Sequence, residues 1–236
     1  MNIALVFAGG VGVRMGGDVP KQYLTLGDRP VLAHALGIFQ SHPEVDGIYL
    51  VVHRDWEATA RQIAADYGIG KLRGIAFGGD SAQASIYNGL VYAAAREPSD
   101  AVVLIHDGAR PYLTPQVVSD NIAAVRRYGN AVTYTPCFET LVLSHDGKRV
   151  DAIPPRRASF AAQAPQSFRL GDILALHARI RARPEGYTDM VDQATICFTL
   201  GVDVHLVEGC RGNVKVTTPE DMVTLAALLD WRARRG

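Results

Sequence analysis

Cysteine is scarce in this chain and follows no metal-binding spacing. The 236 residues include only three cysteines, Cys137, Cys197 and Cys210, which stand far apart along the sequence. Cysteine-based zinc sites and redox-active pairs need cysteines a few residues from one another, so neither is predicted here. An odd and unpatterned count is typical of the reducing cytoplasm, which is where we expect this protein to work.

Long apolar runs and an excess of charge of either sign are also absent. No stretch reaches the roughly 20 apolar residues of a membrane span, and the first apolar run is too short for a signal peptide. Lys and Arg together number 24, as do Asp and Glu, so no bulk field would attract nucleic acid or an anionic membrane. Hydrophobic residues make up 48% of the chain, which is enough for a sizeable core. We therefore expect a globular protein whose partners are neither nucleic acid nor membrane.

Short apolar segments alternate with amphipathic ones along most of the chain. The sequence predicts buried strands at 3–7, 47–52, 72–77, 101–105, 202–207 and 213–216. It predicts helices at 30–39, 56–67, 114–128, 170–181 and 188–200, a further helix ending near residue 95 and a last one beginning at Thr218. This alternation predicts an α/β fold with a mostly parallel sheet and helices on both of its faces, in a single domain over residues 1–236.

The alternation stops between residues 135 and 162. Two β-prone segments, 140–143 and 149–152, flank a turn that contains Asp146-Gly147, a hairpin signal. We interpret this region as a protruding β-arm within the domain. Because an isolated two-stranded hairpin is marginal in water, we expect the arm to pack on a second copy of the protein. An exposed loop is the alternative.

A glycine-rich loop follows the first predicted strand. It reads Ala8-Gly9-Gly10-Val11-Gly12-Val13-Arg14, and Lys21 follows. Glycines expose backbone N–H groups to anions, and two nearby cations suit phosphate groups. No Gly-Lys-Ser/Thr follows, as a Walker A loop requires, and Met15 stands at the third glycine position of a dinucleotide fingerprint. We interpret the segment as a triphosphate-binding loop; a plain strand-to-helix turn is the alternative.

Asp107 follows the strongest buried-strand signal, residues 101–105. Ligands of open α/β sheets bind at the carboxyl ends of strands, where an acid beside a triphosphate needs an intervening cation. Asp107 is therefore a candidate ligand of Mg²⁺, or else a turn-forming residue. His106 beside it is interpreted as structural, because a lone histidine names no mechanism.

Two weaker candidates complete the set of residues. Gly79, Asp80 and Ser85 follow the third strand and could bind the edge of a base, although such residues are also common in loops. Lys215 could contact a second phosphate or simply face solvent. No nucleophile–base pair is recognisable. A phosphate monoester, with a second pKa of about 6, is already an ionised nucleophile at neutral pH, so its transfer chemistry needs mainly positioning and cations.

Five motifs, in order along nearly the whole chain, resemble those of the cytidylyltransferases that act on polyol phosphates. They are Ala8-Gly9-Gly10-x-Gly12-x-Arg14-Met15, Pro20-Lys21-Gln22-Tyr23-Leu24, His106-Asp107-Gly108-Ala109-Arg110-Pro111, Pro165-Gln166-x-Phe168 and Asn213-x-Lys215-Val216-Thr217-x-Pro219-Glu220-Asp221. Two branches look similar, the 2-C-methyl-D-erythritol 4-phosphate and the ribitol-5-phosphate cytidylyltransferases. The resemblance implies a Rossmann-like nucleotidyltransferase fold, CTP and Mg²⁺ as partners, release of pyrophosphate, and a homodimer with interlocked β-arms.

The resemblance also implies a role for individual residues by their position in these motifs. It implies that the triphosphate and the transition state are stabilised by Arg14 and Lys21, and that CTP is bound by Ala8, Gly9, Gly10 and Gly12. Cytosine would be bound by Gly79, Asp80 and Ser85, and the metal and ribose would lie near Asp107 and Arg110. The polyol phosphate would be bound by Thr140, Arg156 and Lys215. Thr140 and Arg156 would act in the neighbouring subunit.

The chain departs from the family pattern at two positions. Ala82 stands where an Arg is usual, and Ala164 replaces a Thr, which removes a hydroxyl near the nucleotide. Residues 165–168 and 195–198 look more like the ribitol branch.

Three other classes of protein stay open. A nucleotide-sugar glycosyltransferase would normally carry Asp-x-Asp where this chain has His-Asp-Gly, the failed fingerprint disfavours a nicotinamide dehydrogenase, and a non-catalytic nucleotide-binding protein could use the same scaffold.

Overall fold

A seven-stranded sheet forms the centre of the computed structural model, which describes residues 1–10 and 19–235. The strand order is β5-β4-β1-β6-β8-β7-β9. The strands are β1 (Asn2–Ala8), β4 (Gly47–Val52), β5 (Leu72–Phe77), β6 (Val102–Asp107), β7 (Asn130–Pro136), β8 (Phe160–Arg169) and β9 (Leu206–Glu208). β8 runs antiparallel to both of its neighbours, and the other pairs are parallel. The prediction of a mostly parallel sheet is confirmed.

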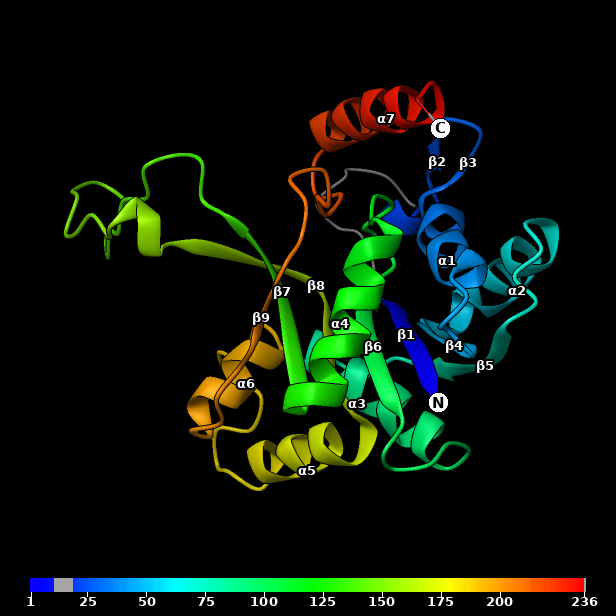
Figure 1. The fold of residues 1–236 in the computed structure, drawn as a ribbon, viewed down its shortest axis with the longest axis horizontal. Helices are drawn as coiled ribbons and strands as arrows, with labels where there is room; N and C mark the ends of the chain where they lie inside the picture. The colour runs from blue at the N-terminus through cyan, green and yellow to red at the C-terminus, as the bar shows by residue number, and fades with distance from the viewer. Residues whose placement is uncertain (11–18, 236) are drawn as a thin grey trace.

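Helices cover both faces of this sheet (Figure 1). One face carries α1 (Val31–Ser41), α2 (Glu57–Asp66) and α4 (Pro115–Tyr128), and the other carries α3 (Ala82–Ala94), α5 (Leu170–Arg181) and α6 (Gln193–Thr199). In β1, Ala4 and Val6 pack toward the first set, whereas Ile3 and Leu5 pack toward the second. Alternate side chains of a strand point to opposite faces, so burial on both faces explains the unbroken apolar run of β1.

The remaining elements lie around this three-layer body. They are the short pair β2 (Thr25–Leu26) and β3 (Arg29–Pro30), the 3-10 helices η2 (Lys21–Tyr23), η3 (Arg54–Trp56) and η4 (Arg156–Ala158), and the last helix, α7 (Pro219–Ala233). α7 packs through Leu225 on a small apolar cluster with Leu26 and Val31. Thr218 and Asp221 form a capping box at its start, as its sequence predicts. Among the described residues, no helix combines the length and the apolar character needed to cross a bilayer.

Several sequence-based expectations for the second half of the chain are wrong. Strands β8 and β7 were both absent from the predicted strands, although β8 pairs with β6 and β7 at the centre of this part of the sheet. The helix expected at 188–200 begins only at Gln193, because the Asp192 carboxylate caps it by accepting the N–H of Thr195. The strand expected at 202–207 is confined to β9, and residues 213–216 form no strand.

The arm leaves the body between β7 and β8, on the left of Figure 1. The expected strands at 140–143 and 149–152 do not form a ladder, because a single bridge, Leu143 to Ala152, joins them. Two strands with no covering layer have little to hold them together. Large apolar side chains between 39% and 61% exposed are spread along the arm: Phe138, Leu141, Val142, Leu143, Val150 and Ile153. The protrusion is as predicted, while its strand pairing is minimal.

Candidate active site

The carboxyl ends of β1, β4, β5 and β6 meet at one edge of the sheet. In register, Ala8 lies opposite Val52, Val52 opposite Phe77, and Phe7 opposite Asp107. The glycine loop, the Gly78-Gly79 segment and Asp107 therefore begin side by side, although they are far apart in the sequence. This is the edge at which open α/β sheets bind their ligands.

Gln22 closes the base of the glycine loop. Its buried side-chain amide donates to the carbonyl of Ala8 at 2.6 Å and to that of Gly10 at 2.9 Å. Two bonds from one amide fix the path of the backbone that enters and leaves Gly9, and they fix Lys21 beside it in η2. In the sequence, Gln22 stands out only as a member of a motif, and nothing there indicates this positioning role. Gly12 and Arg14, which were assigned to the same loop, lie outside the described residues.

Ser85 joins the first loop to the one that follows β5. Its hydroxyl accepts the N–H of Gly79 at 3.0 Å and donates to the carbonyl of Ser81 at 2.8 Å. A Cβ on Gly78 would lie 2.9 Å from this hydroxyl oxygen, and one on Gly9 would lie 3.5 Å from it. Glycine at both positions therefore lets two backbones approach each other closely over Ser85. Asp80, predicted to bind cytosine, is exposed beside them.

Asp107 forms the electrostatic centre of the site. Its Oδ1 lies 2.5 Å from Lys215 Nζ and its Oδ2 lies 2.8 Å from Arg110 Nε. Burial by itself would raise the pKa of the Asp107 carboxyl, but Lys215 and Arg110 outweigh it and lower the pKa to about 2. The carboxylate is thus ionised at neutral pH, and the three side chains together carry one net positive charge.

Asn213 helps to position Arg110 and Lys215. Its backbone carbonyl accepts a hydrogen bond from Arg110 at 2.7 Å, and its fully buried amide donates to the carbonyl of Ala164 at 2.6 Å. Three residues further on, the N–H of Val216 donates to the carbonyl of Ala109 at 2.9 Å. These bonds fix Lys215 on an extended segment that belongs to no strand. The motif contained Asn213, but only the fold reveals its partners.

A cavity of about 210 Å³ opens beside Asp107. Arg110, Lys215 and Asp107 form its charged side, and Ala82 and Ala164, the two departures from the family pattern, also line it. The rest of its polar lining consists of Gln83, Gln163, Gln166, Asp192 and Gln193. Cations on one side, with amides and a single carboxylate elsewhere, suit a small molecule that carries both a phosphate and hydroxyl groups.

The structure does not bring every predicted residue to this cavity. Thr140 and Arg156 lie exposed on the arm and do not line it. His106 is fully buried, with Nε2 3.1 Å from the carbonyl of Arg110, and burial lowers its pKa to about 4, which agrees with a structural role. Within the described part of the chain, no three His, Cys, Asp or Glu side chains cluster as metal ligands.

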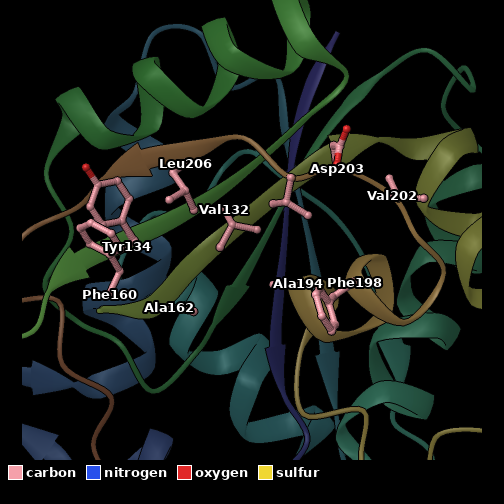
Figure 2. Close-up of a pocket in the computed structure, with 10 residues that line it drawn as sticks. Val132, Tyr134, Phe160, Ala162, Ala194, Phe198, Val202, Asp203 and Leu206 are labelled. Atoms are coloured by element: carbon pink, nitrogen blue, oxygen red, sulfur yellow. The ribbon is translucent and has the colours of Figure 1, made fainter. Parts of the chain in front are cut away.

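A second pocket, of about 370 Å³, shares Ala162 with the first but has none of Asp107, Arg110 and Lys215 in its lining (Figure 2). Figure 2 shows its lining on β7, β8, β9 and α6, with Tyr134 and Phe160 packed edge to face at 4.9 Å between ring centroids. Asp203 is its one charged lining residue. Although this pocket is the larger one, it offers no cation for a phosphate, so we place the chemistry in the smaller cavity.

Comparisons with known proteins all match this chain to cytidylyltransferases that act on polyol phosphates. The IspD family model, described as 2-C-methyl-D-erythritol 4-phosphate cytidylyltransferase, matches residues 2–230. A ribitol-5-phosphate cytidylyltransferase of Streptococcus agalactiae serotype Ia is 38% identical over 98% of this chain and 97% of its own length. A 2-C-methyl-D-erythritol 4-phosphate cytidylyltransferase of Syntrophotalea carbinolica is 40% identical over 96% and 95%. The crystal structure of 4-diphosphocytidyl-2C-methyl-D-erythritol synthase from Anaerococcus prevotii superposes with a TM-score of 0.83 at 28% identity, covering 97% of this chain and 95% of that one.

Proposed function

We propose that this chain, which belongs to the IspD family of cytidylyltransferases and transfers a cytidylyl group from CTP to a polyol phosphate, uses ribitol 5-phosphate as its acceptor. Relatives named for this acceptor match 98% of the chain. The amide-rich cavity lining supports the same choice, because amides bond well to hydroxyl groups and ribitol 5-phosphate carries one more of them than the methylerythritol compound. We also propose the cytoplasm as its location, with which three unpaired cysteines agree.

One observation carries the mechanism: Lys215 and Arg110 flank Asp107 at the rim of a polar cavity. In the proposed reaction, an ionised oxygen of the acceptor phosphate forms a bond to the α-phosphorus of CTP, while the bond from that phosphorus to the bridging oxygen breaks and pyrophosphate leaves. No protein base is required, because the attacking oxygen is already ionised. Lys215 would hold the acceptor phosphate, and Asp107 would keep Lys215 and Arg110 oriented before substrate arrives.

The nucleotide is assigned to the loops after β1 and β5. The residues proposed for the triphosphate are Ala8, Gly9, Gly10, Gly12, Arg14 and Lys21, and those proposed for cytosine are Gly79, Asp80 and Ser85. The close approach of Gly9 and Gly78 over Ser85 supports this division, because it places bare backbone from both loops at one spot.

Mg²⁺ is the cofactor that this chemistry calls for. Mg²⁺ commonly binds through one or two carboxylates together with phosphates of the substrate. The site offers the Asp107 carboxylate at the cavity rim and no larger acidic cluster among the described residues, which fits that mode of binding. We propose that Asp107 provides the protein ligand and that the metal neutralises charge on the triphosphate.

A homodimer is proposed from the arm. Its exposed apolar side chains form a surface that a monomer would leave in water. Thr140 and Arg156 lie outside the cavity of their own chain, so a role in acceptor binding requires the neighbouring subunit's cavity. We propose that each arm completes the partner's site.

Pyrophosphate release tests the proposal directly. The protein is incubated with CTP and Mg²⁺, together with ribitol 5-phosphate in one tube and 2-C-methyl-D-erythritol 4-phosphate in another. We expect faster release with ribitol 5-phosphate and none without an acceptor. Faster release with the methylerythritol compound would overturn the acceptor assignment, and release with neither would contradict cytidylyl transfer to both of these polyol phosphates.

A further inference from the structure

Four glutamine side chains line the catalytic cavity, and two of them are fully engaged in holding the fold. The amide of Gln166 donates to the Asp192 carboxylate at 2.9 Å and accepts the N–H of Ala194 at 3.0 Å. The amide of Gln163 is likewise bonded at both ends, at 3.1 and 3.4 Å, to the segment 210–213. These two glutamines tie β8 to the start of α6 and to the segment 210–213.

Gln83 and Gln193 differ, because each has one end of its amide unused. Gln193 Nε2 donates to Gln83 Oε1 at 2.8 Å, which joins the first turn of α3 to the first turn of α6. Among the described residues, Gln83 Nε2 and Gln193 Oε1 have no hydrogen-bond partner, and neither atom is sealed from solvent although both residues are at most 3% exposed. The pair therefore has one donor and one acceptor left over, and both residues line the cavity.

A free donor and a free acceptor on one cavity wall suit a hydroxylated ligand, because a hydroxyl group can accept one hydrogen bond and donate another. The pair carries no charge, whereas Lys215 and Arg110 line the same cavity and attract phosphate. Asp192, next to Gln193, is a carboxylate whose oxygens accept bonds from Thr195 and Gln166, and its charge disfavours phosphate at this wall. The charges thus direct the acceptor phosphate toward the cations and its carbon chain toward the amides.

We propose that Gln83 and Gln193 form a hydroxyl-binding pair that determines which polyol phosphate the enzyme accepts. The inference rests on the proposed function and adds the residues that make the selection. A straight hydroxylated chain satisfies both free amide atoms. Ribitol 5-phosphate carries one more hydroxyl-bearing carbon beyond its phosphate than 2-C-methyl-D-erythritol 4-phosphate does, and a site built around a hydroxyl rejects an analogue that lacks it. The pair therefore favours ribitol 5-phosphate over the shorter, branched acceptor.

Single and double substitutions test the pair. Gln83→Leu, Gln193→Leu and the double variant are compared with Gln62→Leu, a control on the exposed face of α2 where the amide bonds only to Asp66. For each, kcat/KM is measured with both polyol phosphates at saturating CTP, together with KM for CTP. We expect each single change to lower kcat/KM for ribitol 5-phosphate about tenfold, the scale of one lost hydrogen bond. The value for the methylerythritol compound and KM for CTP should stay within about twofold, and the double variant should lose less than the product of the single losses.

The outcomes separate this inference from the proposed function. An equal loss with both acceptors would show that the pair only supports the fold, and an unchanged ratio would show that it does not read the acceptor; either result overturns the inference. A wild-type preference for the methylerythritol compound would overturn it as well. No turnover of either acceptor by the wild type would instead refute the proposed function. Gln83→Met and Gln193→Met, which keep the side-chain length and favour helix, repeat the test if a leucine variant fails to fold by circular dichroism.

Discussion

The two halves of the sheet are built on different principles. The half formed by β5, β4, β1 and β6 is all parallel and comes from residues 2–107, and its three inner strands, β4, β1 and β6, are buried almost throughout. The half formed by β8, β7 and β9 contains the antiparallel strand, carries the arm, and places amide side chains in the cavity. We assign the nucleotide to the first half and the acceptor to the second. The chemistry common to the nucleotide would thus rest on the regular half, and the choice of acceptor on the irregular one together with Gln83, which α3 contributes from the regular half.

Lys21→Ala should produce the largest loss, because it removes a cation from the half that we assign to the nucleotide. Loss of one preorganised charge stabiliser lowers turnover by about 10²–10³. Pyrophosphate release at saturating substrates measures it, with Lys71→Ala as a control, since Lys71 precedes β5 at the opposite edge of the sheet. Near-normal turnover in the Lys21 variant would remove this residue from the mechanism.

Arg156→Ala tests the other half, by raising KM for the acceptor about tenfold or more while KM for CTP stays unchanged. If arms complete sites in the partner subunit, mixing inactive Lys21→Ala with Arg156→Ala subunits should restore activity. Random pairing leaves about a quarter of the sites with both residues intact in a symmetric dimer. An absence of rescue after verified subunit exchange would show that each arm serves its own chain.

Asp107→Asn probes the junction of the two halves through pH. The folded pKa of Asp107 is about 2, below its ordinary 3.8, so the ionised carboxylate adds stability that is full above pH 4 and is lost as pH falls toward 2. The shift corresponds to roughly 2 kcal/mol in the free energy of unfolding. Urea unfolding at several pH values should show a flatter decline between pH 4 and 2 in the variant. An unchanged decline would mean that Asp107 is not held by Lys215 and Arg110 as described.

Asn213→Ala should have the smallest effect, since it acts only through the segment that carries Lys215. It removes a buried donor to the carbonyl of Ala164 and should lower the free energy of unfolding by about 1–3 kcal/mol. We expect KM for the acceptor to rise severalfold with KM for CTP unaltered, as measured by pyrophosphate release. Loss of CTP affinity instead would place Asn213 on the nucleotide side of the comparison.

The contrast between the halves also explains what the sequence can predict. Segment 3–7 is recognisable as a buried strand because every side chain in it is apolar. The strands predicted at 47–52 and 72–77 match β4 and β5. Pro165 and the buried Gln166 interrupt the apolar pattern of β8, so the pattern does not indicate a strand there. The strand forms because β8 pairs with β6 and β7, which are distant in sequence. A local pattern cannot report such partners.

The site divides in the same way. Asp107 could be found from its place after a buried strand, and the meeting of Asp107 with Lys215 follows from the fold. Gln22 and Asn213 belong to the sequence motifs. Their positioning role depends on hydrogen bonds to backbone carbonyls, which a sequence pattern does not indicate. The Gln83–Gln193 pair spans 110 residues and carried no signal at all.

The central claim is that one cavity edge, from the glycine loop to Lys215, brings CTP and a polyol phosphate together. A crystal structure of the Lys21→Ala variant, soaked with CTP, Mg²⁺ and ribitol 5-phosphate, tests it most directly. We expect the triphosphate along the loop after β1 and the acceptor phosphate on Lys215, with its carbon chain toward α3 and α6. Nucleotide bound in the apolar pocket beside β9, or an acceptor phosphate that does not contact Lys215, would contradict it.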